Sequence, residues 1–166
     1  YRLAYRNLGS HQALVASHTV DVDETDRAGV RWYELRATTG SYSVYQQGTY
    51  APDGNHRWMG SIAMDRVGNI AVGYSVSSPT TFPSIRYAGR VPSDLPGTLQ
   101  AENSITAGGG SQTVSLIRGG DYSSMSIDPV DDCTFWYTTE YLKSSGSFNW
   151  STTIASFRFP GCAPVP

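Results

Sequence analysis

The chain has 166 residues, a formal net charge of −2 and few charged residues (16%), whereas 12% of its residues are aromatic. A slightly acidic chain without a basic run lacks the positive surface that nucleic-acid backbones require, so a nucleic-acid partner is not expected. No apolar stretch approaches the roughly 20 residues of a membrane-spanning helix, so no membrane span is expected. Short apolar runs separated by Gly, Ser and Thr favour an all-β fold with many turns.

The first predicted strands span residues 12–20 and 30–35, and an acidic turn joins them. Asp21, Asp23 and Asp26 place carboxylates at spaced positions in this turn, as calcium-binding loops do. The segment lacks the glycine and the late bidentate Glu of an EF-hand. A solvated turn is therefore one interpretation and a Ca²⁺ site is the alternative. No other cofactor is expected.

The middle of the chain predicts four antiparallel strands, at residues 56–65, 69–77, 83–90 and 97–107. Asp65 ends the first of these strands, and Gly68 lies between the first and the second. An Asp carboxylate accepts backbone N–H groups inside a turn, and glycine tolerates the left-handed backbone of a tight turn. These two residues are therefore predicted to have a structural role.

A repeat is the main signal in the sequence. Residues 61–75 align without a gap on residues 124–138, about sixty positions later, with Ser, Asp, Val and Tyr recurring. Asp128 and Asp131 occupy the second copy of the turn, where Asp131 takes the place of the left-handed residue. Both copies predict a β-hairpin.

Units of about sixty residues with four antiparallel strands each are typical of β-propeller blades. The chain would hold about two and three-quarter such units, at approximately 1–50, 51–110 and 111–166, and the last lacks a clear fourth strand after Phe159. Closed propellers have more blades. The chain is therefore predicted to be a fragment or subunit of a larger ring, whose partners are the remaining blades or further copies of the chain, with the first favoured.

Cys133 and Cys162 are the two cysteines of the chain. An even number in a β-rich, Lys-poor sequence favours one disulfide and an oxidising compartment. Two buried free thiols are the alternative. A disulfide would indicate a secreted, extracellular protein.

Several segments resemble the C-terminal part of large, mostly uncharacterised secreted bacterial proteins that carry β-propellers with sialidase-like blades. They are residues 2–7, 29–36, 57–65 and 120–129, the last running into 132–137. The turn at residues 65–69 is also similar to that of NHL-type blades. The resemblance implies a propeller fold and an extracellular location more strongly than any activity.

A sialidase-like mechanism needs an arginine cluster for a carboxylate, a Tyr nucleophile activated by a carboxylate, and a second acid. The spacing singles out none of the candidates, which are Arg57, Arg86, Arg90, Arg158, Tyr137, Glu140 and Asp121. Glu140 follows Tyr137 by three residues on a predicted strand, which points their side chains to opposite faces. Catalysis therefore stays the less favoured interpretation.

Binding is the favoured function. Arg57, Trp58, Asp121 and Tyr122 precede or open the first strand of a unit, so they are predicted at the loop-rich mouth of the ring. Exposed tryptophans would supply stacking surfaces for sugars, although aromatic residues in strands mostly fill cores. The sequence thus predicts an extracellular binding or structural module with a glycan or protein ligand. The alternatives are part of a sialidase-like glycoside hydrolase and a self-assembling structural protein.

Overall fold

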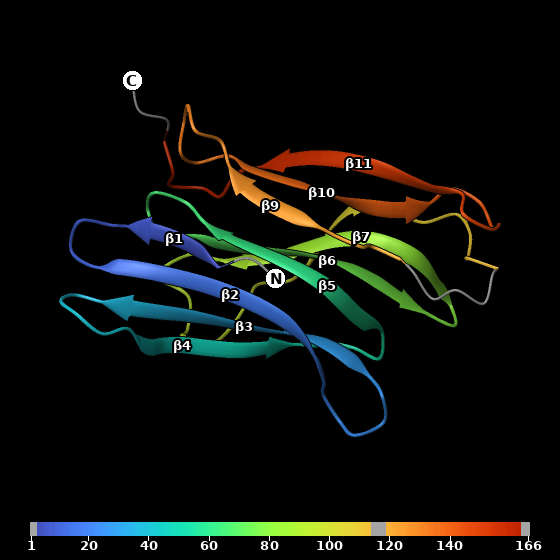
Figure 1. Cartoon of the computed structure of the whole chain (residues 1–166), viewed down its shortest axis with the longest axis horizontal. Helices are drawn as coiled ribbons and strands as arrows, with labels where there is room; N and C mark the ends of the chain where they lie inside the picture. The colour runs from blue at the N-terminus through green and yellow to red at the C-terminus, as the bar shows by residue number, and fades with distance from the viewer. Residues whose placement is uncertain (1–2, 114–118, 164–166) are drawn as a thin grey trace.

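The computed structural model describes residues 3–113 and 119–163, and Figure 1 shows that their strands form three antiparallel sheets. No helix is present in these residues, so none long and apolar enough to cross a membrane occurs there. The predicted all-β class is confirmed.

Each sheet is an up-and-down meander in which consecutive strands are neighbours. The first sheet contains β1 (Ala4–Asn7), β2 (Gln12–Asp21), β3 (Ala28–Ala37) and β4 (Ser43–Tyr50). The second contains β5 (His56–Met64), β6 (Ile70–Ser78), β7 (Thr81–Arg90) and β8 (Asn103–Thr106). The third contains β9 (Ser124–Ile127), β10 (Phe135–Leu142) and β11 (Trp150–Phe157). This is the strand order of propeller-like blades, whereas closure into a ring and the unit boundaries stay predictions.

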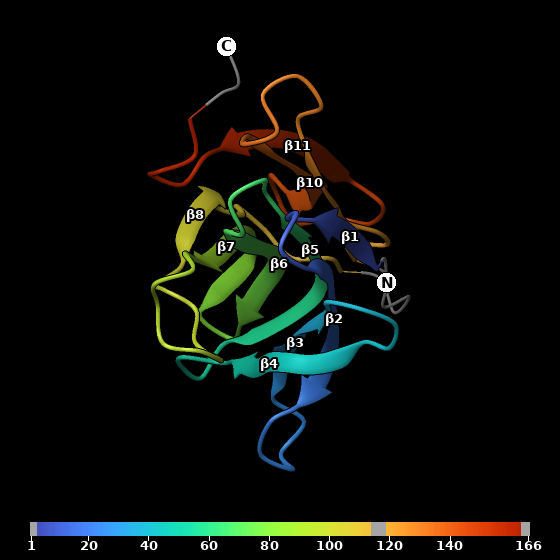
Figure 2. The same cartoon turned by 90° about the vertical axis from the view of Figure 1, so that its left-hand side faces the viewer.

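The three sheets are stacked as layers with the second in the middle, as Figure 2 shows. Strand β6 is buried on both faces because neighbouring sheets cover both sides of it. Its larger side chains, Val72 and Tyr74 among them, join the core toward the first sheet. Gly73 faces the third sheet, where a Cβ atom would lie 2.6 Å from the ring of Tyr137. Small residues on this face therefore allow the second and third sheets to approach closely.

The four strands predicted for the middle of the chain are present, but the last is shorter than expected. Strand β8 covers 103–106, whereas the prediction began at residue 97. Pro92 and Pro96 interrupt strand pairing, and Gly97 has a φ of 79°. The Gly97 amide donates to Oε1 of Gln46 in β4, at 3.0 Å. The segment before β8 therefore packs on the first sheet and does not extend the second.

Both copies of the predicted hairpin are present, with Met64 pairing with Ile70 and Ile127 pairing with Phe135 across their turns. The second turn is two residues longer, so the gap-free alignment is wrong beyond the turn. A displacement of two residues leaves each side chain on the same face of its strand. The repeat was therefore recognisable in spite of the difference in length.

The first turn is organised by Asp65, which is fully buried. Its Oδ1 accepts the amides of Val67 (3.0 Å) and Asn69 (2.9 Å), and Oδ2 accepts the Asn69 side-chain amide (2.7 Å). Burial raises the pKa of Asp65, although these hydrogen bonds act in the opposite direction. Gly68 adopts the left-handed backbone, with a φ of 89°.

The second turn uses two aspartates. Asp128 accepts the amide of Val130, and Asp131 accepts the amides of Cys133 (2.9 Å) and Thr134 (2.8 Å). The left-handed residue is Asp132, with a φ of 55°, one position after the predicted Asp131. The carboxylate of Asp131 is thus free to accept backbone amides because the next residue provides the reversal of the chain.

One arginine joins all three sheets at one end of the stack. Arg6 in β1 donates from Nε to the carbonyl of Met64, at the end of β5, at 3.2 Å. Its guanidinium also contacts both oxygens of Asp132, in the β9–β10 turn, at 2.6 and 2.7 Å. We call these three residues the Arg6 clamp.

Cys133 and Cys162 form a disulfide with a Cα–Cα distance of 5.6 Å. The bond joins the turn before β10 to the segment after β11. Disulfides persist in oxidising compartments, which agrees with an extracellular location; the location itself stays a prediction.

Candidate functional site

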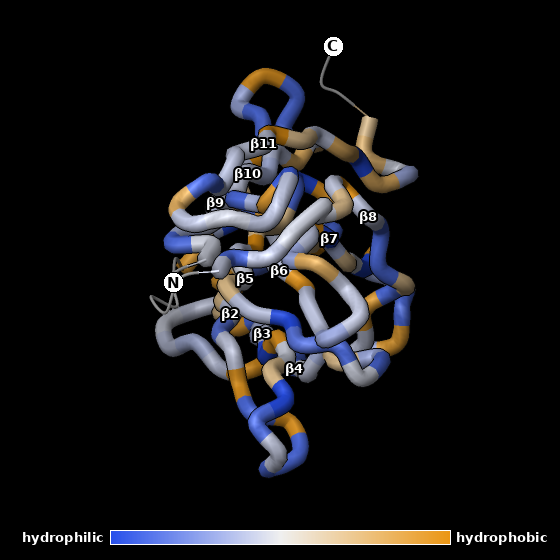
Figure 3. Tube along the Cα trace, turned by 90° about the vertical axis from the view of Figure 1, so that its right-hand side faces the viewer, coloured by the Kyte–Doolittle hydropathy of each residue, from blue (hydrophilic) through white to orange (hydrophobic). Residues whose placement is uncertain are grey.

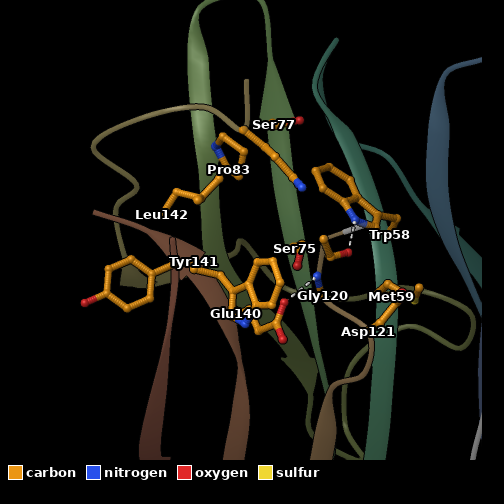
Figure 4. Close-up of a pocket in the computed structure, with 13 residues that line it drawn as sticks. Trp58, Met59, Ser75, Ser77, Pro83, Gly120, Asp121, Glu140, Tyr141 and Leu142 are labelled. Carbon is orange, nitrogen blue, oxygen red and sulfur yellow. Dashed lines mark hydrogen bonds between the residues drawn. The ribbon is translucent and has the colours of Figure 1, made fainter. Parts of the chain in front are cut away.

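A cleft of about 300 Å³ lies between the second and third sheets, at the end of the stack away from the Arg6 clamp. Figure 4 shows side chains from β5, β6 and β10 around it, together with the segment before β9. Trp58 and Trp150 supply two indole rings, and Asp121 and Glu140 supply two carboxylates. The other described lining residues are Met59, Ser75, Ser77, Pro83, Gln112, Gly119, Gly120, Tyr141 and Leu142.

The cleft exists because β6 carries small side chains where it faces the third sheet. Trp58 pairs with Ser75 in the register of β5 and β6, so the indole and the small serine share one face. Ser77 lines the cleft two positions further along the same face. The sheets are in close contact near Gly73 and leave open space beside Ser75 and Ser77.

The wall before β9 is held by polar contacts from both sheets. The Gly120 amide donates to Oε2 of Glu140 at 3.2 Å, and Nε1 of Trp58 donates to the carbonyl of Gly119 at 3.5 Å. Gly120 has a φ of 77°, which favours glycine at this position. Asp121 follows directly and is exposed at the rim.

Both tryptophan rings are positioned by neighbours outside the open space. Trp150 packs edge-to-face on Phe148, with ring centroids 5.9 Å apart, and it remains 43% exposed. Trp58 is restrained by its bond to Gly119. The rings are therefore oriented before any ligand binds.

The structure brings together two of the four residues predicted at the mouth. Trp58 and Asp121 line the cleft, and Tyr122 lines an adjacent smaller cavity. Arg57 lines neither cavity, and its side chain is fully buried on the opposite face of β5. Adjacent residues of a strand point to opposite faces, so the prediction that grouped Arg57 with Trp58 is wrong in this respect.

Arg57 belongs to a charged cluster between the first and second sheets. It contacts Asp53 at 2.8 Å and Glu102 at 2.9 Å. Burial alone would lower the pKa of Arg57, but its hydrogen bonds to Asp53 and Glu102 raise it. Arg86 shares Glu102 at 2.5 Å, and the Tyr74 hydroxyl donates to the same carboxylate at 2.8 Å. These arginines are neutralised within the fold and do not face the cleft.

The other candidates for a sialidase-like mechanism are dispersed as well. Arg90 is buried and donates to the carbonyl of Asp94 at 2.9 Å, and Arg158 is exposed after β11. Tyr137 is 1% exposed, and burial raises the pKa of its hydroxyl well above the usual range. A buried phenol that resists ionisation is a poor nucleophile. None of the candidate arginines is among the described residues that line the cleft with Asp121 and Glu140.

The acidic β2–β3 turn projects from the body and is mostly hydrophilic, as Figure 3 shows. Its carboxylates serve the turn itself: Asp21 accepts the amides of Asp23 (3.2 Å) and Glu24 (3.1 Å), and Asp23 accepts from Arg27 (2.5 Å). Asp26 has a left-handed φ of 61°. No group of three acidic, His or Cys side chains is placed to hold a metal in the described parts of the chain. The Ca²⁺ site and the solvated turn therefore both stay predictions for this segment.

Sequence reasoning considered Trp150 only as one of several aromatic residues and did not place it with Trp58. The two come from strands of different sheets, more than ninety positions apart in the sequence. Glu140 was considered only for catalysis. The pairing of Leu142 with Trp150 sets the position of Trp150 at the cleft, and a single sequence gives no signal for this register.

The sequence matches no protein-family model and no curated protein. The fold is similar to the crystal structure of a thermostable family-43 glycoside hydrolase, with a TM-score of 0.49 and 12% sequence identity. The match covers 99% of this chain and 58% of the hydrolase chain. The chain therefore spans less than two thirds of the length of that enzyme.

Proposed function

We propose that the chain is an extracellular carbohydrate-binding module and that its ligand binds in the cleft between the second and third sheets. The observation that carries this proposal is the presence of two oriented indole rings and two carboxylates in one cleft. Sugars have apolar C–H faces that pack on aromatic rings, and their hydroxyls donate hydrogen bonds to carboxylates. Trp58 and Trp150 would contact the faces, and Asp121 and Glu140 would accept the hydroxyls.

The size of the cleft agrees with this role. Small-molecule sites occupy roughly 300–1,000 Å³, and this cleft lies at the lower end of that range. A cleft of this size suits a short part of a glycan. Restrained aromatic rings favour binding because less side-chain freedom is lost when the ligand is seated.

The charge of the cleft decides which sugars are expected. None of the described lining residues is Arg, Lys or His, whereas Asp121 and Glu140 carry negative charge. A sialic-acid carboxylate would be repelled by these groups and would lack a bidentate arginine partner. We therefore expect a neutral glycan, which departs from the ligand that sialidase-like blades imply.

The test is a glycan array that displays neutral and sialylated glycans, followed by calorimetry with the best neutral ligand. Trp58→Ala and Trp150→Ala should each weaken binding at least tenfold, equivalent to about 1.4 kcal/mol. Trp136→Ala is the matched control. Trp136 is 41% exposed on the third sheet, which also carries Trp150, but it lies outside the cleft. Binding of sialylated glycans alone, or an equal loss in the control, would contradict the proposal.

Glycoside hydrolysis is the second candidate, favoured by the presence of Asp121 and Glu140 in the same cleft. Glycosidases use two carboxyl groups that flank the scissile bond. A panel of chromogenic glycosides tests this alternative with Asp121→Asn and Glu140→Gln. Hydrolysis would be established if the parent cleaves a glycoside and either substitution abolishes this cleavage. If a ligand binds but no glycoside is cleaved, the binding function is favoured.

The predicted partners also stay a proposal, supported by an apolar row on the outer face of the first sheet. Tyr5, Leu14, Leu35 and Val44 are neighbours across its four strands, and Tyr5 and Val44 are 55% and 52% exposed. A further blade of a longer polypeptide would cover this row. A second copy of the chain is the alternative. It would be favoured if the 166-residue chain sediments as a dimer and the Val44→Asp variant sediments as a monomer.

A further inference from the structure

The cleft between the second and third sheets has two ends of different chemical character. Pro83 of β7 and Leu142 of β10 lie at one end, whereas Gly120 and Asp121 lie at the other, as Figure 4 shows. Glu140 precedes Leu142 by two positions on β10, which places their Cα atoms roughly 7 Å apart along the strand. One sugar unit with a short substituent is therefore long enough to contact both ends.

The carboxylates at the polar end accept hydrogen bonds. Oε2 of Glu140 takes the amide of Gly120 at 3.2 Å, and a carboxylate has further lone pairs for a second donor. Asp121 is exposed at the rim. The indole N–H of Trp58 is engaged by the carbonyl of Gly119, at 3.5 Å. A ligand is therefore held at this end by donors of its own, which are hydroxyl or amide N–H groups.

The apolar end combines a proline with a leucine. Pro83 has no backbone N–H group, and the carbonyl of Leu142 already accepts the amide of Gly109 at 2.8 Å. Leu142 is 7% exposed, so it offers a small apolar surface. A ligand hydroxyl placed here would lose its hydration without gaining a hydrogen bond from these two residues. This end of the cleft therefore favours a small apolar group.

A glycine-rich segment packs directly on the two strands of the apolar end. A Cβ atom at Gly108 would collide with the carbonyl of Pro83, and a Cβ atom at Gly109 would collide with the carbonyl of Lys143. The Gly108 amide also donates to Oγ of Ser84, at 2.9 Å. Closely packed backbone therefore lies beside the apolar end, which favours a group as small as a methyl over a second sugar ring.

We propose that the ligand is a neutral sugar with an acetamido group, such as N-acetylglucosamine. An acetamido group joins one N–H donor to one methyl, which are the features that the two ends of the cleft select. The methyl packs between Pro83 and Leu142, and the N–H donates to Glu140. The ring hydroxyls donate to Asp121, and Trp150, the partner of Leu142 in the strand register, packs on the sugar. This inference rests on the proposed carbohydrate-binding function and names the class of sugar.

The experiment compares three β-1,4-linked disaccharides by calorimetry, those of N-acetylglucosamine, glucose and glucosamine. The N-acetylglucosamine disaccharide should bind at least about tenfold more tightly than the glucose disaccharide, because a buried methyl and an added hydrogen bond act together. The glucosamine disaccharide keeps the nitrogen but lacks the methyl and carries positive charge. It therefore separates packing at the apolar end from attraction to the carboxylates.

Pro83→Ala and Leu142→Ala test the apolar end through the ratio of two affinities. Each should reduce the preference for the N-acetylglucosamine disaccharide over the glucose disaccharide to less than about threefold. Misfolding lowers both affinities together, so a change in their ratio identifies a role in specificity. Pro83 is half-buried, so its variant keeps the test valid if Leu142→Ala does not fold. Leu95→Ala is the control, because Leu95 is 76% exposed and lies outside the cleft.

Equal affinities for the N-acetylglucosamine and glucose disaccharides, or a preference that both variants retain, would overturn the acetamido site. The proposed function would still stand if Trp58→Ala weakened binding of the glucose disaccharide or of another neutral glycan. Preferred binding of the glucosamine disaccharide would show that the carboxylates select a cation, which would overturn both the acetamido group and the neutral ligand. Failure of every glycan on the array to bind would overturn the proposed function itself.

Discussion

Replacement of Glu102 by alanine is expected to destabilise the protein strongly, because this carboxylate is the common partner of four donors. Arg57 contacts it through Nε at 3.0 Å and through its terminal nitrogen at 2.9 Å, and Arg86 and the Tyr74 hydroxyl complete the set. The Glu102 side chain is 15% exposed and that of Arg57 is fully buried. Loss of the carboxylate leaves the buried guanidinium with fewer partners.

Loss of one partner of a buried ion pair costs about 3–5 kcal/mol. Arg57 retains Asp53, at 2.8 and 3.0 Å, so the lower end of this range applies to Glu102→Ala. For a domain of this size, each kcal/mol lowers the melting temperature by about 2–4 °C. A loss of about 3 kcal/mol therefore corresponds to a fall of about 6–12 °C.

Urea denaturation and thermal melts of the two variants and the parent would measure this difference. Asp53→Ala is the matched control: Asp53 contacts the same guanidinium, but its side chain is 45% exposed, so a loss of only about 1 kcal/mol is expected. If Glu102→Ala lowers the free energy of unfolding no more than Asp53→Ala does, burial does not determine how much each ion pair stabilises the fold, and the prediction is refuted.

Three further predictions concern acid, the disulfide and the packing of the sheets. The pKa of Asp53 and of Glu102 is lowered, the former mainly by its Arg57 bonds and the latter by three donors that outweigh burial. Both groups therefore add stability above their ordinary pKa values, 3.8 and 4.5, that is lost as the pH falls below them. Urea midpoints from pH 6 to pH 3 should fall less steeply for Glu102→Gln than for the parent, and equal slopes would argue against this linkage. The disulfide closes a loop of 29 residues, so its reduction should lower the free energy of unfolding by roughly 3–4 kcal/mol. Urea denaturation with and without reductant measures this difference, and identical curves would show that the bond does not constrain the chain. Gly73→Ala should lower the free energy of unfolding by about 1–3 kcal/mol, because its Cβ atom would meet the Tyr137 ring. Gly54→Ala is the control, since a Cβ atom there has nothing within 4 Å, and it should melt at the same temperature as the parent. Equal melting temperatures for the two variants would contradict the close approach of the sheets.

Local pattern was sufficient to predict the hairpins of the fold. The turn around Asp65 and Gly68 and the alternation along β6 are short-range features, and they placed the middle strands nearly where the structure has them. The predicted start of β8 was too early because the segment from Pro92 to Gly97 packs on the first sheet through Gln46. Such a contact between sheets leaves no periodic signal in the segment itself.

The candidate site was less accessible to sequence reasoning. Trp58 and Asp121, which were predicted as neighbours because each precedes or opens the first strand of its unit, both line the cleft, whereas their role in binding stays a prediction. Arg57 was grouped with them by sequence proximity, although strand alternation turns it toward Glu102. Trp150 reaches the cleft only through the packing of two sheets and the register of β10 and β11. Contacts of this kind depend on tertiary structure and cannot be deduced from one sequence.

The Arg6 clamp has a mechanical consequence for the cleft. It fixes the three layers to one another where β5 ends at Met64 and where the turn before β10 contains Asp132. The cleft lies at the far ends of the same strands, near Trp58 and Glu140. A bulky ligand that widened the cleft would therefore have to break the weaker contacts of Trp58 with Gly119 and of Gly120 with Glu140, while the clamp kept the opposite ends of the sheets in register.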